Sequence, residues 1–239
     1  MNKVLRSLFC GAALTGALTC ASLAADFTPC ADTLHSLGLF EGTGSGYALD
    51  RAPTRAEAAV MLVRLLGQED AARKLTYTAP FTDLEGWEAP YVQYLYDNKL
   101  TTGATATTFE PKAKCSAQMY TTFLLRSLGY SDAQNGDFAY TGALDFAADH
   151  VGLIDESFCD TNNFLRDNVA AMSLEALATP VKATDITLLD KLIADGAIDQ
   201  IKAAPLSQFI DLAESYNKAV STPITRAEQD VTARMTMKA

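Results

Sequence analysis

The sequence predicts an all-α protein in which three helix–loop–helix repeats are followed by further helices. Residues 53–67 show the clearest pattern: apolar side chains at helical spacing, a capping box formed by Thr54 and Glu57, and Gly67 at the expected helix end. The same apolar stripe recurs 62 residues later, before Gly129, and more faintly 111 residues later. Because a short helix–loop–helix unit cannot cover its own apolar face, we expect the three repeats to share one core, with at most very short strands.

The N-terminal residues are typical of an export signal. Lys3 and Arg6 precede an apolar run, and small residues at 22–24 suit a cleavage site. The run is shorter than the about 20 residues that a membrane-spanning helix needs, so we expect a secreted product without a transmembrane segment after signal removal. The predicted organisation is a signal peptide at 1–24, repeats at 25–70, 78–131 and 136–182, and a C-terminal helical extension at 183–239.

Charge limits the partners of this chain. The formal net charge is −10, and it becomes −12 without Lys3 and Arg6. A chain this acidic repels polyanions at long range, so we expect no nucleic-acid partner. Any anionic ligand has to be held by local cations. In the C-terminal extension, apolar spacing predicts one helix that ends before Gly196 and another that begins after Pro205.

The cysteines outside the predicted signal are Cys30, Cys115 and Cys159, and their spacing matches neither a CxxC pair nor a regular disulfide framework. Two interpretations stay open: small buried apolar side chains, or one disulfide with a free thiol. His35 and His150 have no neighbouring ligand set, and no catalytic motif is present. We therefore expect no enzyme activity, no metal and no cofactor.

The second repeat carries a family resemblance. Phe-Thr-Asp at 81–83 is followed by Trp87, and later by Phe-Glu-Pro at 109–111. Together with Thr-Arg-Ala-Glu at 54–57 before an apolar helix, these residues resemble S-layer homology motifs over roughly residues 27–177. The resemblance implies a pseudo-threefold helical assembly. It also implies that grooves between motifs bind a peptidoglycan-linked secondary cell-wall polymer, often pyruvylated, without a covalent bond.

The resemblance also implies which residues bind the polymer. Arg55 would contact the acidic sugar, and Thr54 would shape the helix start. Asp83 and Trp87 of the next repeat would line the same groove, and Arg166, which aligns with Arg55, could serve a second groove. The chemistry is suitable, because a guanidinium matches a carboxylate, an aromatic face packs on a sugar, and a carboxylate accepts hydroxyl hydrogen bonds.

Each of these residues also has a purely structural interpretation. Arg55 could pair with an acidic residue of an adjacent repeat, Trp87 could belong to the core, and Asp83 could cap the helix that follows it. The repeats also depart from the family pattern, since Ala117 replaces the arginine in repeat two and Tyr140 replaces the tryptophan in repeat three. At most one groove, between repeats one and two, keeps most of the implied ligand set.

The function predicted from these observations is non-enzymatic anchoring of a secreted bacterial protein to the cell wall. The alternative is a degenerate repeat that serves as a structural or protein-interaction scaffold at the cell envelope. A third interpretation, a wall hydrolase, depends only on the compartment and on the abundance of carboxylates.

Overall fold

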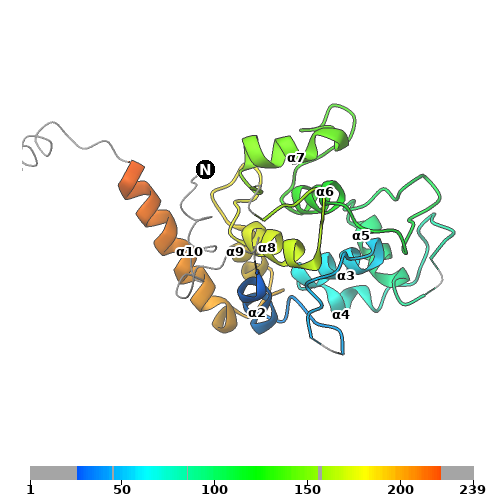
Figure 1. Ribbon diagram of the computed structural model, residues 1–239, viewed down its shortest axis with the longest axis horizontal. Helices are drawn as coiled ribbons and strands as arrows, with labels where there is room; N and C mark the ends of the chain where they lie inside the picture. The colour runs from blue at the N-terminus through cyan, green and yellow to red at the C-terminus, as the bar shows by residue number, and fades with distance from the viewer. Residues whose placement is uncertain (1–25, 45, 85, 156–157, 222–239) are drawn as a thin grey trace, which may run out of the picture.

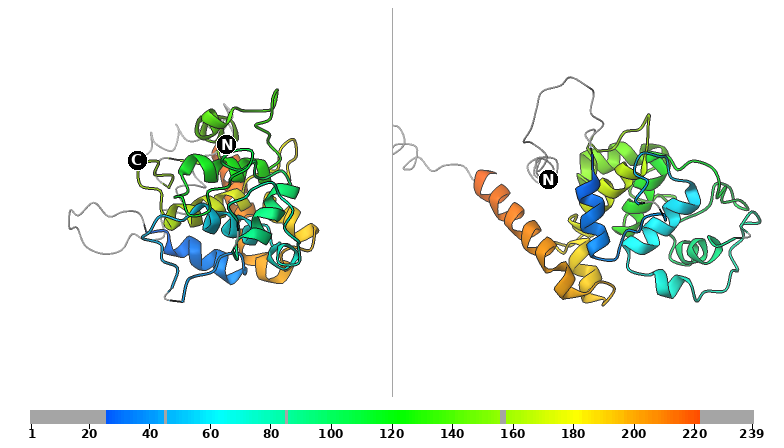
Figure 2. Two further views of the ribbon diagram at one scale, coloured as in Figure 1. Left: turned by 90° about the vertical axis from the view of Figure 1, so that its right-hand side faces the viewer. Right: turned by 60° about the horizontal axis from the view of Figure 1, so that its bottom comes forward.

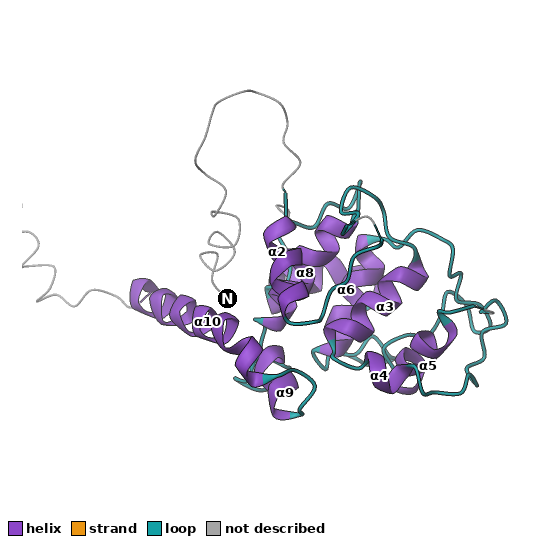
Figure 3. Ribbon diagram, turned by 90° about the horizontal axis from the view of Figure 1, so that it is seen from below, coloured by secondary structure: helices purple, strands orange, loops and turns teal. Residues whose placement is uncertain are grey.

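The computed structural model describes residues 26–44, 46–84, 86–155 and 158–221, and the predicted signal peptide lies outside these ranges. Within them the chain is helical, and β pairing is limited to isolated bridges such as that between Thr54 and Lys114 (Figure 3). The predicted all-α fold is confirmed. No described helix combines the length and the apolar composition needed to cross a lipid bilayer.

The helices lie in the order that the repeats predict (Figure 1). Each repeat contributes a first and a second helix, and the boundaries assigned to the repeats stay predictions. The elements are α2 (Thr28–Ser36), α3 (Arg55–Leu65), α4 (Glu69–Ala72), α5 (Ala89–Asp97), α6 (Ala117–Ser127), the 3-10 turn η2 (Tyr140–Gly142), α7 (Ala143–Phe146), the π turn η3 (Ala147–Val151), α8 (Arg166–Leu177), α9 (Leu188–Ala194) and α10 (Gln200–Ser221).

The second helices begin at side-chain caps of decreasing completeness. At α3 the capping box is complete: the Glu57 N–H donates to the Thr54 hydroxyl at 3.2 Å, and the Thr54 N–H donates to the Glu57 carboxylate at 2.8 Å. Ser116 caps α6 without the reciprocal bond. At α8 only the second bond of the capping box is present: the Leu165 N–H donates to the Asn168 side chain at 2.7 Å.

The three second helices form the centre of the molecule. Helices α3, α6 and α8 contact one another, and each is covered by a first helix of the next repeat in a ring: α5 packs on α3, α7 on α6, and α2 on α8 (Figures 1 and 2). The interior is apolar around Leu62, Leu124 and Met172, all fully buried. The buried Tyr120 hydroxyl is 2.7 Å from the Ser173 hydroxyl and joins α6 to α8. The three repeats therefore share one core, as the sequence predicts.

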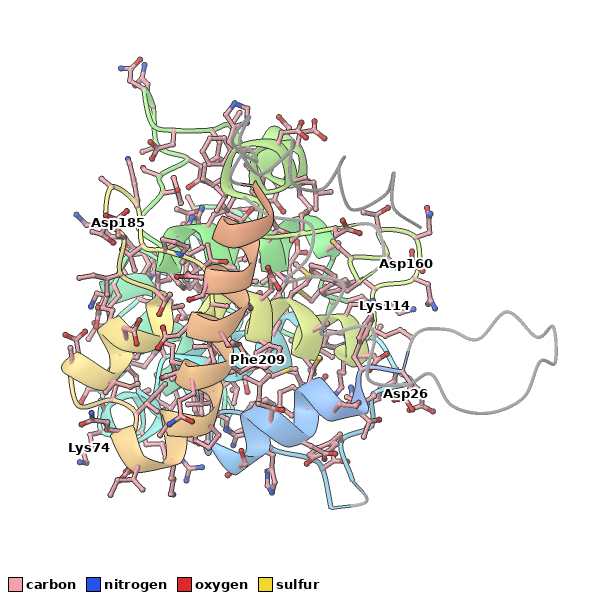
Figure 4. The ribbon with its side chains drawn as sticks, turned by 90° about the vertical axis from the view of Figure 1, so that its left-hand side faces the viewer. Asp26, Lys74, Lys114, Asp160, Asp185 and Phe209 are labelled. Atoms are coloured by element: carbon pink, nitrogen blue, oxygen red, sulfur yellow. The ribbon has the colours of Figure 1, made fainter. Side chains whose placement is uncertain are left out.

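Helix α10 differs from the prediction, because it begins at Gln200 and contains Pro205 instead of following it. Asp199 supplies the start signal: its carboxylate accepts the N–H groups of Ile201 and Lys202 at 2.9 and 3.0 Å. Pro205 cannot donate to the carbonyl of Ile201, but Ile201 is 85% exposed, so water can replace that bond. Figures 1 and 3 show α10 projecting from the body, and Figure 4 shows it beside α2.

The three cysteines outside the predicted signal peptide, Cys30, Cys115 and Cys159, are buried. Burial raises the pKa of Cys115 to about 12 and that of Cys159 to about 11, and no disulfide joins these two. A thiol with so high a pKa is a poor nucleophile at neutral pH. Cys115 and Cys159 therefore act as small apolar side chains, the first of the two interpretations.

Candidate functional site

Arg55, at the start of α3, inserts into the loop of repeat two. Its Nε donates to the carbonyl oxygen of Phe109 at 2.7 Å, and its guanidinium carbon lies 5.1 Å from the centre of the Phe109 ring. One terminal nitrogen lies 3.0 Å from the sulfur of Met119. Among the described residues no carboxylate bonds to Arg55, so the alternative in which Arg55 pairs with an acidic residue of an adjacent repeat is not formed there.

Arg166, at the start of α8, inserts into the loop of repeat one in the same manner. Its Nε donates to the carbonyl oxygen of Tyr47 at 2.9 Å, its guanidinium lies 5.5 Å from the centre of the Phe40 ring, and one terminal nitrogen lies 3.4 Å from the sulfur of Met61. The other terminal nitrogen donates to the backbone oxygen of Glu41 at 3.3 Å. The two arginines therefore occupy equivalent positions in the ring of repeats.

A groove of about 450 Å³, here called the Trp87 groove, lies beside Arg166. One wall is α3, the opposite wall is the start of α5 with the residues before it, and the loop of repeat one closes one end. Trp87 is 60% exposed, whereas Arg166 is 4% exposed and lies at the base. The groove is lined by Glu41, Gly42, Thr43, Glu57, Val60, Met61, Arg64, Arg73, Trp87, Pro90, Tyr91 and Arg166.

The carboxylates of this lining are already engaged by arginines. Both terminal nitrogens of Arg51 donate to the Glu57 carboxylate, at 2.8 and 2.5 Å, and this hydrogen bonding lowers the pKa of Glu57. Glu41 lies 3.0 Å from a terminal nitrogen of Arg64. These glutamates are therefore held in place, and their charges are largely offset.

Arg166 differs from the other arginines of the groove in its bonding. Within the described residues it bonds to two backbone oxygens and a sulfur but to no carboxylate. Burial and the nearby charge of Arg51 lower its pKa, although a guanidinium stays protonated at neutral pH. Three of its five N–H groups are used, which leaves two that could donate to a ligand. The base of the groove thus carries a guanidinium that no described carboxylate bonds directly, although the charge of Glu57 acts on it and raises its pKa.

The structure brings two of the predicted site residues together, Trp87 and Arg166, but Arg55 is not part of the Trp87 groove. Arg166 of repeat three enters the loop of repeat one. Helix α3 of repeat one is in turn covered by α5 of repeat two, the repeat that carries Trp87. An arginine therefore meets the aromatic residue two repeats along the ring. Arg55 lies near Tyr140, whose pKa is raised by burial and partly lowered by the Arg55 charge.

The remaining predicted residues have structural contacts. Asp83 accepts the N–H groups of Phe109 and Glu110 at 2.8 and 2.7 Å, so the expectation that it caps the following helix is wrong; α5 has no side-chain cap. Thr54 forms the capping box of α3. The alternative placing Trp87 in the core is also wrong, because its side chain is largely exposed. Whether any of these residues binds carbohydrate stays a prediction.

Four residues around this groove were missed from the sequence: Arg64, Glu69, Arg73 and Tyr91. A signal for the first two was present. In repeat one, Arg64 precedes the helix-ending Gly67 by three positions and Glu69 follows that glycine by two. Repeat two has Arg126 and Asp132 in similar places around Gly129. A repeated arginine–acid pair across a helix end indicates an ion pair, and both pairs form.

Comparison with known proteins adds the following. Residues 80–116 match the family described as S-layer homology domain. The chain is 30% identical over 121 residues to the "Middle cell wall protein" of Brevibacillus brevis, 30% over 106 residues to the "Surface layer protein" of Brevibacillus choshinensis, and 28% over 109 residues to an "Endoglucanase" of a Bacillus species. These alignments cover 49%, 43% and 41% of this chain but 12%, 10% and 12% of the relatives, so the chain spans about a tenth of their length.

Proposed function

Because the chain is an S-layer homology domain protein, related at about 30% identity to bacterial surface-layer and cell-wall proteins, we propose that it anchors to the cell wall through the Trp87 groove. The proposed ligand is an acidic, peptidoglycan-linked secondary cell-wall polymer. We propose that the polymer carries pyruvylated sugars, as the resemblance to S-layer homology motifs implies. These relationships indicate the bacterial cell surface as the site of action.

One observation carries the proposal: an exposed tryptophan and an arginine without a carboxylate partner among the described residues line one groove. The indole of Trp87 offers an apolar face to the C–H surface of a sugar, and Arg166 offers two N–H groups to a carboxylate. A positive charge at the base of a groove is unusual on a chain whose formal net charge is −10. An acidic glycan fits this combination better than a neutral glycan does.

We propose further that the groove binds without catalysis. A glycosidase needs a carboxylic acid whose pKa is raised, together with a second carboxylate. In the Trp87 groove the pKa of Glu57 is lowered by its hydrogen bonds from Arg51, which is the wrong direction for a general acid. The similarity to an endoglucanase covers 12% of that protein and therefore carries no activity to this chain.

Cosedimentation of the mature protein with purified cell walls tests the proposal. We expect Trp87→Ala to weaken binding about tenfold, because one lost aromatic–sugar contact corresponds to about 1.4 kcal/mol. Tyr96→Ala is the matched control, since Tyr96 is an aromatic residue of α5 that is 40% exposed but does not line the groove. Binding should also weaken with rising salt and after removal of pyruvyl groups. Wild-type protein that stays in the supernatant, or equal binding by Trp87→Ala, would contradict the proposal.

A scaffold function is the second candidate, and one observation favours it. At the start of α6 the side chain is Ala117, 2% exposed, where the other two repeats have an arginine. The interface formed by the start of α6 has therefore lost the cation that an acidic glycan would need. On this second candidate function the interface is structural and the chain binds a surface protein. The purified protein should then not bind walls from which proteins have been stripped.

A further inference from the structure

Glu69 lies behind the Trp87 groove and bonds to residues of both its walls. Its carboxylate accepts two hydrogen bonds from Arg64, from Nε at 2.8 Å and from a terminal nitrogen at 2.9 Å. The hydroxyl of Tyr91 donates to it at 2.8 Å, and a terminal nitrogen of Arg73 donates at 2.7 Å. Arg64 belongs to α3 and Tyr91 to α5, so one carboxylate connects the two helices that form the groove.

The partners of Glu69 line the groove, while Glu69 itself does not. The Arg73 Nε also lies 3.0 Å from the Tyr91 hydroxyl, which closes the network on itself. Tyr91 in turn packs edge-to-face against Trp87, with ring centres 6.5 Å apart. Glu69 therefore orients Arg73 and the aromatic wall, and it shares the orientation of Arg64 with Glu41, which lies 3.0 Å from a terminal nitrogen of that arginine.

We propose that Glu69 is a positioning residue for ligand binding in the Trp87 groove. Its carboxylate fixes the guanidinium groups of Arg64 and Arg73 at the rim, and through Tyr91 it fixes the surface on which Trp87 rests. This inference rests on the proposed function, since it concerns the same groove and the same acidic glycan.

Charge alone predicts the opposite effect, which makes the inference testable. A carboxylate beside an anion-binding groove repels the ligand, so removing it should strengthen binding if orientation does not matter. Hydrogen bonding from Arg64, with smaller effects of Arg73 and Tyr91, lowers the pKa of Glu69 to about 2, so the group is ionised at every pH used for binding assays. A negative charge kept at this place is favourable to binding only if the orientation it imposes outweighs the repulsion.

Repeat two provides an internal comparison. Arg126 occupies the place of Arg64 and bonds to Asp132 through Nε at 2.8 Å and a terminal nitrogen at 2.7 Å. The Arg126 side chain is 9% exposed, and neither residue lines the Trp87 groove. The arginine–acid pair is thus a shared structural feature of these two repeats. The carboxylate of Glu69 additionally bonds to Arg73 and to Tyr91 of α5, and these two residues connect the pair to the groove.

The experiment compares Glu69→Gln with Asp132→Asn in the full mature chain. Each substitution keeps the size of the side chain and removes one carboxylate from an equivalent ion pair. We measure the affinity for purified acidic wall polymer by calorimetric titration, and stability by thermal unfolding. We expect Glu69→Gln to weaken binding about fivefold or more and Asp132→Asn to change it less than twofold, both titrated at a temperature at which thermal unfolding shows each variant to be folded.

Tyr91→Phe supplies a second measurement that does not depend on the folding of Glu69→Gln. It keeps the ring against Trp87 and removes only the hydroxyl bonded to Glu69, so we expect a two- to threefold loss of affinity. The double variant should bind no more weakly than Glu69→Gln alone, because both changes break the same network.

The possible results are distinguishable. Equal or tighter binding by Glu69→Gln and unchanged binding by Tyr91→Phe would overturn the positioning role and leave the proposed function intact. An equal loss in Asp132→Asn would show that stability alone is responsible, which also overturns the positioning role. Wild-type protein that does not bind the polymer would instead refute the proposed function, and this inference with it.

Discussion

Replacing Asp83 tests whether this residue holds a loop or binds a ligand. In the structure its two carboxylate oxygens accept the N–H groups of Phe109 and Glu110, at 2.8 and 2.7 Å. The same loop presents the Phe109 carbonyl to Arg55. Glu110 adopts a left-handed backbone conformation, with φ of 59°, which a non-glycine residue keeps only when its surroundings enforce it. Asp83→Ala should therefore loosen the loop that receives Arg55.

The expected magnitude follows from these two bonds. A hydrogen bond to a charged group contributes about 1.5–3 kcal/mol, and the more exposed of the two amides can recover part of this from water. We expect a loss of about 2–3 kcal/mol in the free energy of unfolding. For a domain of this size that corresponds to a decrease in Tm of about 4–12 °C.

Urea and thermal unfolding of Asp83→Ala measure this loss. The control is Asp149→Ala, which changes an exposed aspartate on η3 and should stay within about 0.5 kcal/mol of wild type. Wall binding should fall no more than the loss of folded protein explains. Undiminished stability together with lost wall binding would refute this reasoning and would make Asp83 a ligand contact, as the family resemblance implies.

Two further predictions concern backbone space and pH. Gly67→Ala should lower the free energy of unfolding by about 2–3 kcal/mol, because φ is +65° and a Cβ would lie 2.4 Å from the carbonyl oxygen of Ala197. The control is Gly38→Ala, where φ is +76° but a Cβ would meet no atom, so the loss should be only about 1 kcal/mol. Burial raises the pKa of Asp167 to about 6, above its unfolded value of about 3.9. The folded state therefore binds more protons between these values, and this group lowers stability as pH rises through 6. Asp167→Asn keeps an oxygen for the Phe27 N–H, at 3.0 Å, so it should be more stable than wild type at pH 7 and equal below pH 4.

The local features of the fold could be predicted from the sequence because neighbouring residues determine them. The capping box of Thr54 and Glu57 and the apolar stripe that follows it identify α3, and the recurrence of the stripe identifies the shared core. Pro205 misled the prediction of α10, because an exposed second turn tolerates a proline when Asp199 caps the helix start.

The composition of the groove could not be predicted, because it depends on how the repeats follow one another in space. The sequence shows that Arg55 and Arg166 are equivalent, but it does not show which aromatic residue each arginine meets. That pairing follows from α5 packing on α3 while α8 inserts its arginine into the loop before α3. For the same reason the partners of Asp83, 26 and 27 residues away, are absent from any local pattern.

Fluorescence of Trp87 tests the central claim most directly. It is the single tryptophan of the chain and is 60% exposed, so emission excited at a wavelength that tyrosine does not absorb reports on this groove alone. Titration with purified acidic wall polymer should shift the emission to shorter wavelength and reduce quenching by acrylamide, and both changes should saturate together with cosedimentation. Binding to walls with emission and quenching unchanged would show that the polymer is held elsewhere on the molecule.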